Sequence, residues 1–189
     1  MKILLLSEDE KLRLYLESTG NEVTKANGVV SAVFVKNGNY DWLISYGYRN
    51  KISSKVLSLF DPSRRINLHI SYLPWNKGAD PNLWSWIDKT PKGVSIHQLD
   101  SGIDTGPICH RRHIALVADE DTLRTSYEKL SKGMFELFKD TWPQACRRGG
   151  YGTITLRDNE TGSSHLKSQR PKLDRGWDTP VLEFMIDRL

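Results

Sequence analysis

An asparagine, a histidine and an aspartate in two short segments have the side-chain chemistry needed to transfer an acyl group. Asn67 and His69 lie two positions apart at the end of a run typical of a β-strand, where such residues point to the same side. The amide can donate a hydrogen bond to an oxygen that gains negative charge, and the imidazole can take up or release a proton. An Asn-x-His pattern is also compatible with a purely structural role, so these two residues alone do not define a site.

The third residue, Asp104, lies in the segment DSGIDTGP (100–107). Its two glycines and its proline favour a tight turn that a ligand can approach closely. Asp104 could cap this turn, or it could orient His69 and stabilise its charged form, as the acid of a catalytic triad does. Between the two segments, SYLPWNKGADP (71–81) has the composition of a rigid binding loop or of an ordinary strand-to-helix connection.

The elements that must position these residues follow an alternating pattern, which predicts an α/β fold with a Rossmann-like, mostly parallel sheet flanked by helices. Buried strands are predicted at 2–6, 41–46, 65–70, 93–99 and 108–116, and helices at 8–18, after Ser53 and after Asp80. Residues 29–36 are compatible with either a strand or a helix.

A long amphipathic helix is predicted from Asp121 or Thr122, because apolar residues recur there every three or four positions. The residues of this apolar stripe are Leu123, Tyr127, Leu130, Met134 and Phe138. The catalytic domain is therefore expected to cover 1–148, and a short C-terminal extension to cover 149–189. Within the extension, a short hairpin is predicted near 151–164 and a small helix over 179–189.

Composition narrows the class of protein. The 189 residues include 27 Lys or Arg and 23 Asp or Glu, and this net charge of +4 is scattered, which argues against a nucleic-acid-binding protein. No apolar run reaches the ~20 residues of a membrane span, and the N-terminus lacks the pattern of a signal peptide, so a cytoplasmic location is expected. Cys109 and Cys146 form neither a disulfide framework nor a zinc motif, and no metal site is expected.

Taken together, these segments resemble the 10-formyltetrahydrofolate-dependent formyltransferases. INLHISYLPWNKGADPNLW (66–84) is similar to the family's Asn-x-His strand and Leu-Pro loop. KGVSIHQLDSGIDTGPI (92–108) is similar to its Gly-Val-Thr-Ile-His strand and Asp-x-Gly-Pro turn, and ISYGYRNKIS (44–53) to the strand and loop that line the folate pocket. The likeness runs from residue 1 to about 147 and continues weakly into GSSH (162–165).

The resemblance implies roles for individual residues and implies 10-formyltetrahydrofolate as the formyl donor, without a metal. Asn67, His69 and Asp104 match the family's catalytic trio, whereas His97 matches a structural strand histidine. The residues that match the folate-binding segments are Tyr46, Gly47, Tyr48, Arg49, Leu99, Gly102 and Ile103. Those that match the segment contacting the amine substrate are Ser71, Trp75, Asn76, Lys77 and Gly78.

In the implied reaction, an unprotonated amine attacks the formyl carbon of the donor. His69 would take the proton of the amine or, once charged, stabilise the oxyanion, and the sequence leaves both roles open. Asn67 would donate a hydrogen bond to the same oxygen, and Asp104 would orient His69.

Among the family's substrates, the sequence favours an amino sugar linked to a nucleotide. Glu8, Asp9 and Glu10 would repel a phosphate where glycinamide ribonucleotide formyltransferases hold one. The segment after the long helix is expected to be too short for the tRNA-binding domain of methionyl-tRNA formyltransferases. These two substrates remain alternatives, as do a formyltetrahydrofolate hydrolase and a non-catalytic folate- or nucleotide-binding module. The extension is expected to pack on the core or on a second copy, which would give a homodimer.

Overall fold

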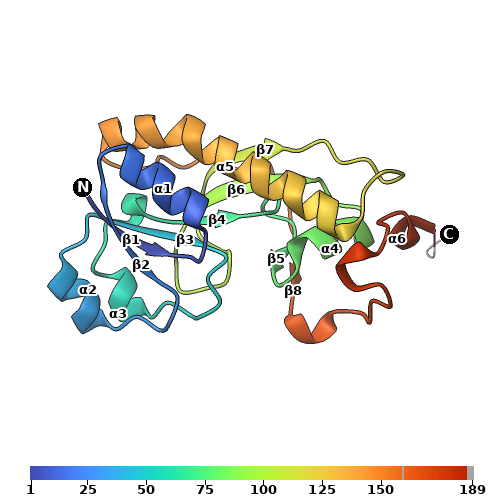
Figure 1. The fold of residues 1–189 in the computed structure, drawn as a ribbon, viewed down its shortest axis with the longest axis horizontal. Helices are drawn as coiled ribbons and strands as arrows, with labels where there is room; N and C mark the ends of the chain where they lie inside the picture. Colours follow the sequence, from blue (N-terminus) through green and yellow to red (C-terminus); the bar gives the residue numbers. More distant parts are fainter. Residues whose placement is uncertain (159, 187–189) are drawn as a thin grey trace. The chain divides into compact units, whose positions relative to one another are not determined.

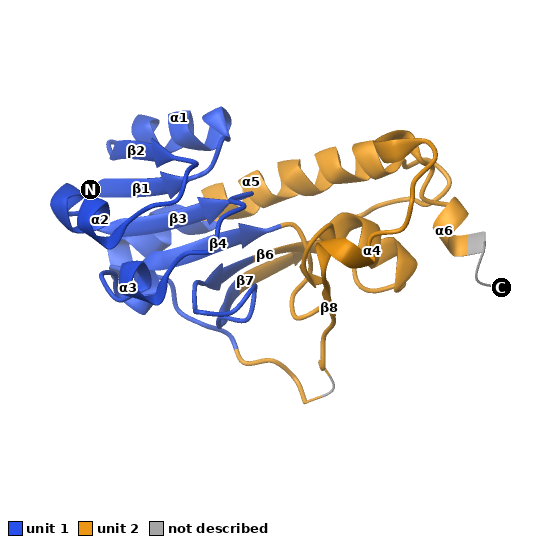
Figure 2. Cartoon of the chain, turned by 90° about the horizontal axis from the view of Figure 1, so that it is seen from below, with its two compact units in different colours: residues 1–69, 96–109, 141–154 blue, residues 70–95, 110–140, 155–189 orange. Residues whose placement is uncertain are grey.

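A computed structural model describes residues 1–158 and 160–186 of the chain. The chain forms two compact units, each assembled from three separate segments (Figure 2). Unit 1 consists of Met1–His69, Ile96–Cys109 and Thr141–Ile154, and unit 2 of Ile70–Ser95, His110–Asp140 and the described residues from 155 onward. The predicted domain boundary between 148 and 149 stays a prediction, because each unit contains residues from both sides of it.

The central element is a six-stranded sheet with the order β2-β1-β3-β4-β6-β7 (Figure 1). Its strands are β1 (Lys2–Leu6), β2 (Glu22–Ala26), β3 (Trp42–Tyr46), β4 (Arg65–His69), β6 (Gly93–Gln98) and β7 (Ile108–His113). The pairs β1–β2, β1–β3 and β3–β4 are parallel, and Ser45 of β3 lies opposite Asn67 of β4. The predicted α/β class and mostly parallel sheet are confirmed.

Strand β6 runs against the direction of β4. The N–H of Leu99 donates to the carbonyl of Arg65, and the side chain of Asn67 meets that of His97, so residue numbers rise along one strand as they fall along the other. This arrangement places His97, near the end of β6, beside Asn67, in the middle of β4.

In unit 1, three helices begin at side chains that accept a hydrogen bond from an N-terminal N–H group. These helices are α1 (Glu10–Ser18), α2 (Ala32–Gly38) and α3 (Ser54–Leu57), and their caps are Asp9, Ser31 and Ser53. The segment 29–36, which the sequence left open, therefore forms mainly a helix, because Ser31 starts one there. Figure 1 shows α1 on the opposite face of β1 and β3 from α2 and α3. The core on the α2 and α3 side contains Leu4, Leu6, Val35, Leu43, Val56, Leu57 and Phe60.

Unit 2 contains the helices α4 (Pro81–Ile87) and α6 (Glu183–Ile186) and a short parallel pair, β5 (Lys77–Gly78) with β8 (Ser164–His165). Its core consists of Leu83, Trp84, Trp86, Ile87, Leu123 and Val181. The 3-10 turns of the chain are Pro62–Arg64, Lys167–Gln169 and Gly176–Asp178.

The long predicted helix is α5 (Leu123–Arg148), which contributes residues to both units. Four of its five predicted stripe residues are buried, namely Leu123, Leu130, Met134 and Phe138, whereas Tyr127 is exposed. No helix among the described residues combines the length and the apolar character that a bilayer crossing requires.

The C-terminal extension differs from its prediction in one respect. The hairpin predicted near 151–164 is wrong: over 151–158 and 160–164 the only strand residue is Ser164, which pairs with Lys77. The tail therefore meets its partner strand in a distant part of the sequence. Helix α6 accounts for part of the helix predicted over 179–189, of which 187–189 lie outside the described residues.

Two neighbouring leucines test the core of unit 1. Leu57 is 3% exposed and belongs to the core cluster, whereas Leu59 is 43% exposed. We expect Leu57→Ala to lower the free energy of unfolding by about 2–5 kcal/mol, because it removes buried methyl groups and leaves a cavity. Leu59→Ala serves as the control and should change it by less than about 1 kcal/mol. Urea denaturation of both variants measures the difference, and equal losses would contradict the assigned core.

Candidate active site

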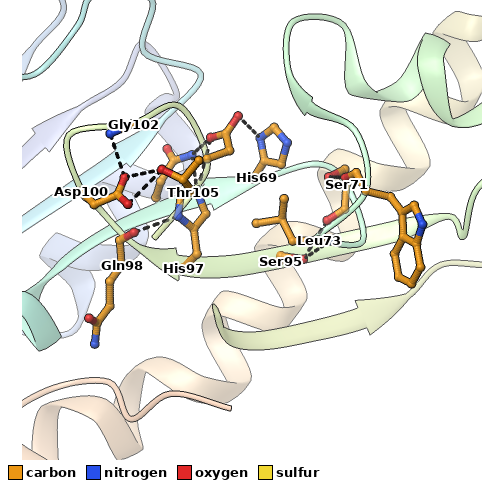
Figure 3. Close-up of polar contacts among 12 residues, drawn as sticks. His69, Ser71, Leu73, Ser95, His97, Gln98, Asp100, Gly102 and Thr105 are labelled. Atoms are coloured by element: carbon orange, nitrogen blue, oxygen red, sulfur yellow. Dashed lines mark hydrogen bonds and ion pairs between the residues drawn. The ribbon is translucent and has the colours of Figure 1, made fainter. Parts of the chain in front are cut away.

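The three residues expected to do chemistry are neighbours in unit 1. His69 Nδ1 lies 3.6 Å from Asp104 Oδ2, and Asn67 Nδ2 donates a hydrogen bond to Asp104 Oδ1 at 3.2 Å. Asn67 and His69 come from β4, and Asp104 comes from the turn between β6 and β7, which folds back toward the strand. Figure 3 shows His69 and the turn that contains Asp100 and Thr105 on the same side of the sheet.

A fourth polar side chain, His97, completes the group (Figure 3). Its Nδ1 lies 2.9 Å from the carbonyl oxygen of Gln98, which can only accept, so Nδ1 is the donor. Nε2 then faces Asn67 Nδ2 at 3.1 Å and Asp104 Oδ1 at 3.4 Å. The position of His97, almost completely buried, suits a residue that orients Asn67 and Asp104 rather than one that meets a substrate.

The site holds a carboxylate largely out of water, since the Asp104 side chain is 11% exposed and that of His69 is 8% exposed. A charge at such a position is costly unless polar groups compensate for it. Here the amide of Asn67 donates to the carboxylate and the imidazole of His69 faces it, while His97 accepts from the same amide and holds it in place. The same low exposure strengthens each of these electrostatic interactions.

The turn that presents Asp104 is fixed by its own hydrogen bonds. The Asp100 carboxylate accepts from the N–H of Gly102 at 3.0 Å and from the hydroxyl of Thr105 at 2.8 Å. Asp104 has a left-handed backbone with φ of 53°, which a non-glycine residue adopts only where its surroundings hold it. A side chain at Gly106 would collide with a backbone oxygen of β6. The position of the Asp104 carboxylate is therefore set by a compact, internally bonded turn.

The residues predicted to bind folate lie on two segments of unit 1. In the loop after β3, the Tyr48 hydroxyl donates to the carbonyl of Gly28 at 2.7 Å, and Gly47 has open space around it. In the turn after β6, Leu99 packs against the core, while Ile103, next to Asp104, is 64% exposed. A flat, uncharged ring system needs apolar contacts and backbone hydrogen-bonding groups, and these segments offer both. The residues present therefore fit the pterin head of a folate.

The residues predicted to meet the amine lie in unit 2 and fall into two kinds. Ser71 is buried and donates to the carbonyl of Trp75 at 2.8 Å, and the buried Asn76 donates to Thr90 Oγ1 at 2.6 Å. These two side chains hold the loop in shape. Trp75 and Lys77 are half-exposed, so they are better placed to contact a substrate.

The remaining predicted position, Gly78, has a φ of 91° in β5, where a side chain would collide with the backbone of β8. The role assigned to Gly78 is therefore better described as allowing the close approach of these two strands. The Leu73–Pro74 peptide bond in the same loop is cis.

Two other kinds of chemistry find no support in the structure. Burial raises the pKa of the Cys109 thiol to about 12 and that of the Cys146 thiol to about 11, which disfavours a nucleophilic thiolate. Across the described residues, no cluster of three or more histidines, cysteines, aspartates or glutamates is arranged to hold a metal ion.

The residues that support the site were not predicted from the sequence. Asp100 and Thr105 were not singled out, although an aspartate two positions before a glycine is a local signal for such a turn. The contacts of 160–165 with the loop at 73–79 had no local signal, because they join segments far apart in the chain.

A fold of this class with a histidine, an aspartate and an asparagine gathered at one place is typical of an acyl-transfer enzyme, and comparisons with known proteins specify the class. The formyl transferase family matches residues 21–140. The formyltransferase PseJ from Anoxybacillus kamchatkensis is 44% identical, with 97% of each chain covered and a TM-score of 0.88. Its crystal structure contains UDP-4,6-dideoxy-4-formamido-L-AltNAc and tetrahydrofolate.

Two further structures extend the comparison. Rv3404c from Mycobacterium tuberculosis, a likely sugar N-formyltransferase, is 26% identical over 88% of this chain and 75% of that chain, with a TM-score of 0.72. Phosphoribosylglycinamide formyltransferase from Streptococcus pneumoniae TIGR4 is 18% identical over 76% of this chain and 97% of that chain, with a TM-score of 0.59, and shares the fold. The chain belongs to the formyl transferase family and is a tetrahydrofolate-dependent formyltransferase.

Thr105 tests the turn that holds the carboxylate. Thr105→Val keeps the shape of the side chain but removes the donor to Asp100, so Asp104 loses part of its support. We expect the kcat for formyl transfer to fall on the order of 10–100-fold, because small displacements of catalytic groups are costly. Thr105→Ser retains the hydroxyl and should keep kcat near that of the wild type. Steady-state kinetics with thermal melts as a folding control measure both variants, and an unchanged kcat in Thr105→Val would refute the role of the turn.

Proposed function

We propose that this chain transfers the formyl group of 10-formyltetrahydrofolate to a primary amine of a nucleotide-linked amino sugar, with a UDP-linked 4-amino sugar as the first substrate to test. The observation that carries the substrate class is the 44% identity to PseJ over 97% of both chains. The close grouping of Asn67, His69 and Asp104 supports the chemistry. We also propose that the protein acts in the cytoplasm. The homodimer expected from the extension stays a prediction.

His69 is the proposed proton-transfer residue. When bound, the donor supplies the formyl carbon that the amine attacks. Because Asp104 faces Nδ1 of His69, the proton on Nδ1 is held there, and the other ring nitrogen, Nε2, takes the proton of the amine. The carboxylate stabilises the resulting imidazolium, which can then donate a hydrogen bond to the formyl oxygen as negative charge develops on it. As the bond between the formyl carbon and the folate nitrogen breaks, the imidazolium gives its proton to that nitrogen, so that tetrahydrofolate leaves and His69 is neutral again.

Asn67 supports this arrangement through its amide. In the structure its Nδ2 is shared between Asp104 Oδ1 and His97 Nε2, so its two hydrogens hold the carboxylate and the neighbouring imidazole. The proposed donation by Asn67 to the formyl oxygen requires that one of these bonds be exchanged when the substrates bind. Asn67 thus links the position of Asp104 to the oxygen that gains charge.

The turn between β1 and α1 favours a nucleotide-sugar substrate over a ribonucleotide that would bind its phosphate at this turn. The Asp9 carboxylate accepts from the N–H of Leu12 at 2.7 Å, so a carboxylate already occupies the N-terminus of α1. Glu10 pairs with both Arg13 and Lys25, which consumes the nearby positive charge. A phosphate would meet acidic groups at this turn, and the diphosphate of a nucleotide sugar must bind elsewhere.

Lys77 is a suitable cation for that diphosphate. It lies in the predicted amine-substrate loop, two residues after Trp75, and its side chain forms no ion pair with a described residue. Trp75 offers a ring to a nucleotide base or a sugar and is itself stacked on Tyr72, with ring centroids 6.2 Å apart. Both side chains are half-exposed.

The substrate class is tested with 10-formyltetrahydrofolate and a panel of amines, following the release of tetrahydrofolate. The panel holds UDP-linked and dTDP-linked sugars aminated at position 3 or 4, together with glycinamide ribonucleotide. We expect turnover with a UDP-linked 4-amino sugar and at least 100-fold lower kcat/KM with glycinamide ribonucleotide. Formate release that does not depend on any amine would instead indicate a hydrolase and overturn the proposal.

The catalytic roles are tested by His69→Ala and Asn67→Ala. Each variant should lose about 10²–10³-fold or more in kcat, because a proton acceptor or a donor to the developing charge is lost. Circular dichroism and thermal melts check that both variants fold. Near-wild-type turnover in folded His69→Ala is incompatible with the mechanism.

A further inference from the structure

The segment 160–165 in the C-terminal extension binds the loop 73–79 along its length, and both lie in unit 2. The N–H of Lys77 donates to the carbonyl of Ser163 at 3.0 Å, and the N–H of Ala79 donates to the carbonyl of His165 at 3.1 Å. This loop carries the predicted amine-substrate residues Trp75 and Lys77. The segment lies beyond residues 21–140, the part of the chain that matches the family.

Ser163 makes the most specific of these contacts. Its hydroxyl accepts from the backbone N–H of Asn76 at 2.9 Å and donates to the side-chain oxygen of the same residue at 3.1 Å. Asn76 is fully buried and has a left-handed backbone with φ of 57°, so it depends on outside partners to keep this conformation. Asn76 is next in sequence to both Trp75 and Lys77, and Ser163 therefore fixes the point from which these two side chains project.

His165 anchors the other end of the segment. Its ring stacks on Trp84 with centroids 3.9 Å apart and an angle of 3°, and its Nε2 lies 2.6 Å from Asp88 Oδ2. Trp84 belongs to the core of unit 2, so His165 attaches the segment to that packed core.

Arg111 secures the beginning of the segment. It pairs with Glu160 at 2.8 Å and donates to the carbonyl of Leu73 at 2.9 Å, and its guanidinium lies 4.5 Å from the ring centroid of Tyr72. The loop 73–79 is thus held at its start, its middle and its end by contacts that involve the extension.

We propose that the segment 160–165 is the element that sets the affinity for the amine substrate, with Ser163 and His165 as positioning residues for the loop 73–79. The inference rests on the proposed function, because it takes this loop as the surface that meets the amino sugar. A loop without these partners would have to be ordered at the moment of binding, and that entropy would be lost from the affinity. The predicted folate segments lie in unit 1, so the KM for the donor should not respond.

Two adjacent serines provide a matched test. Ser163→Ala removes both hydrogen bonds to Asn76, whereas Ser164→Ala changes an exposed serine whose hydroxyl has no hydrogen-bond partner among the described residues. We expect Ser163→Ala to raise the KM for the UDP-linked amino sugar on the order of 5–100-fold, since a buried donor and acceptor lose their partner. The KM for 10-formyltetrahydrofolate should stay unchanged, kcat at saturating amine should change by less than about threefold, and Ser164→Ala should match the wild type.

A second variant, His165→Phe, and a measurement that does not depend on activity, amide hydrogen exchange, extend the test. His165→Phe retains a ring on Trp84 but loses the contact with Asp88, and it should raise the same KM to a smaller extent. Hydrogen exchange of the Asn76 and Lys77 amides should be faster in Ser163→Ala than in Ser164→Ala. Equal KM values and equal exchange in the two serine variants, or a rise in the KM for the donor as large as that for the amine, would overturn the proposal. If the wild-type protein formylates none of the amines, the proposed function is refuted. The comparison of the two serine variants tests only the role of the segment.

Discussion

Asp104 carries a carboxylate that water hardly reaches, and the site depends on how that charge is compensated. Asn67 Nδ2 donates to it at 3.2 Å and His69 Nδ1 faces it at 3.6 Å. His97 Nε2 accepts from Asn67 at 3.1 Å and so keeps that amide directed at the carboxylate. A buried charge with partners at several angles resists displacement, because moving it in any direction weakens one of the interactions. The orientation of the His69 ring follows from this constraint.

Polar side chains also hold two loops of the protein in shape. In unit 1 the Asp100 carboxylate closes the turn that presents Asp104, and in unit 2 the hydroxyl of Ser163 holds Asn76. Both supported residues have a left-handed backbone, which would be strained without these partners. Loops supported in this way keep their reactive or binding side chains in place, which lowers the entropy lost on binding and in the transition state.

Substrate preference depends on the loops of this fold more than on the fold itself. A phosphoribosylglycinamide formyltransferase shares the architecture at 18% identity, yet the turn after β1 here carries Asp9 as a helix cap and Glu10 in ion pairs. The residues that follow the strands are free to vary while the strands pack the core, so the shared fold does not fix the charge of this turn. The extension adds a second variable element, because it holds the loop at 73–79.

Local patterns in the sequence determined most of the sheet, the apolar stripe of α5, the cap of α3 at Ser53, and the choice of Asn67, His69 and Asp104 as candidates. Strand and helix periodicity and turn composition are short-range properties, so they can be recognised without the fold. The tertiary structure alone decided that the amide of Asn67 faces His97, that Asp100 and Thr105 support the turn, and that 160–165 pairs with the loop at 73–79 instead of forming a hairpin. These features join residues that are distant in the chain or depend on which of several possible hydrogen-bond partners a side chain selects. That selection is made by packing, which no local pattern specifies.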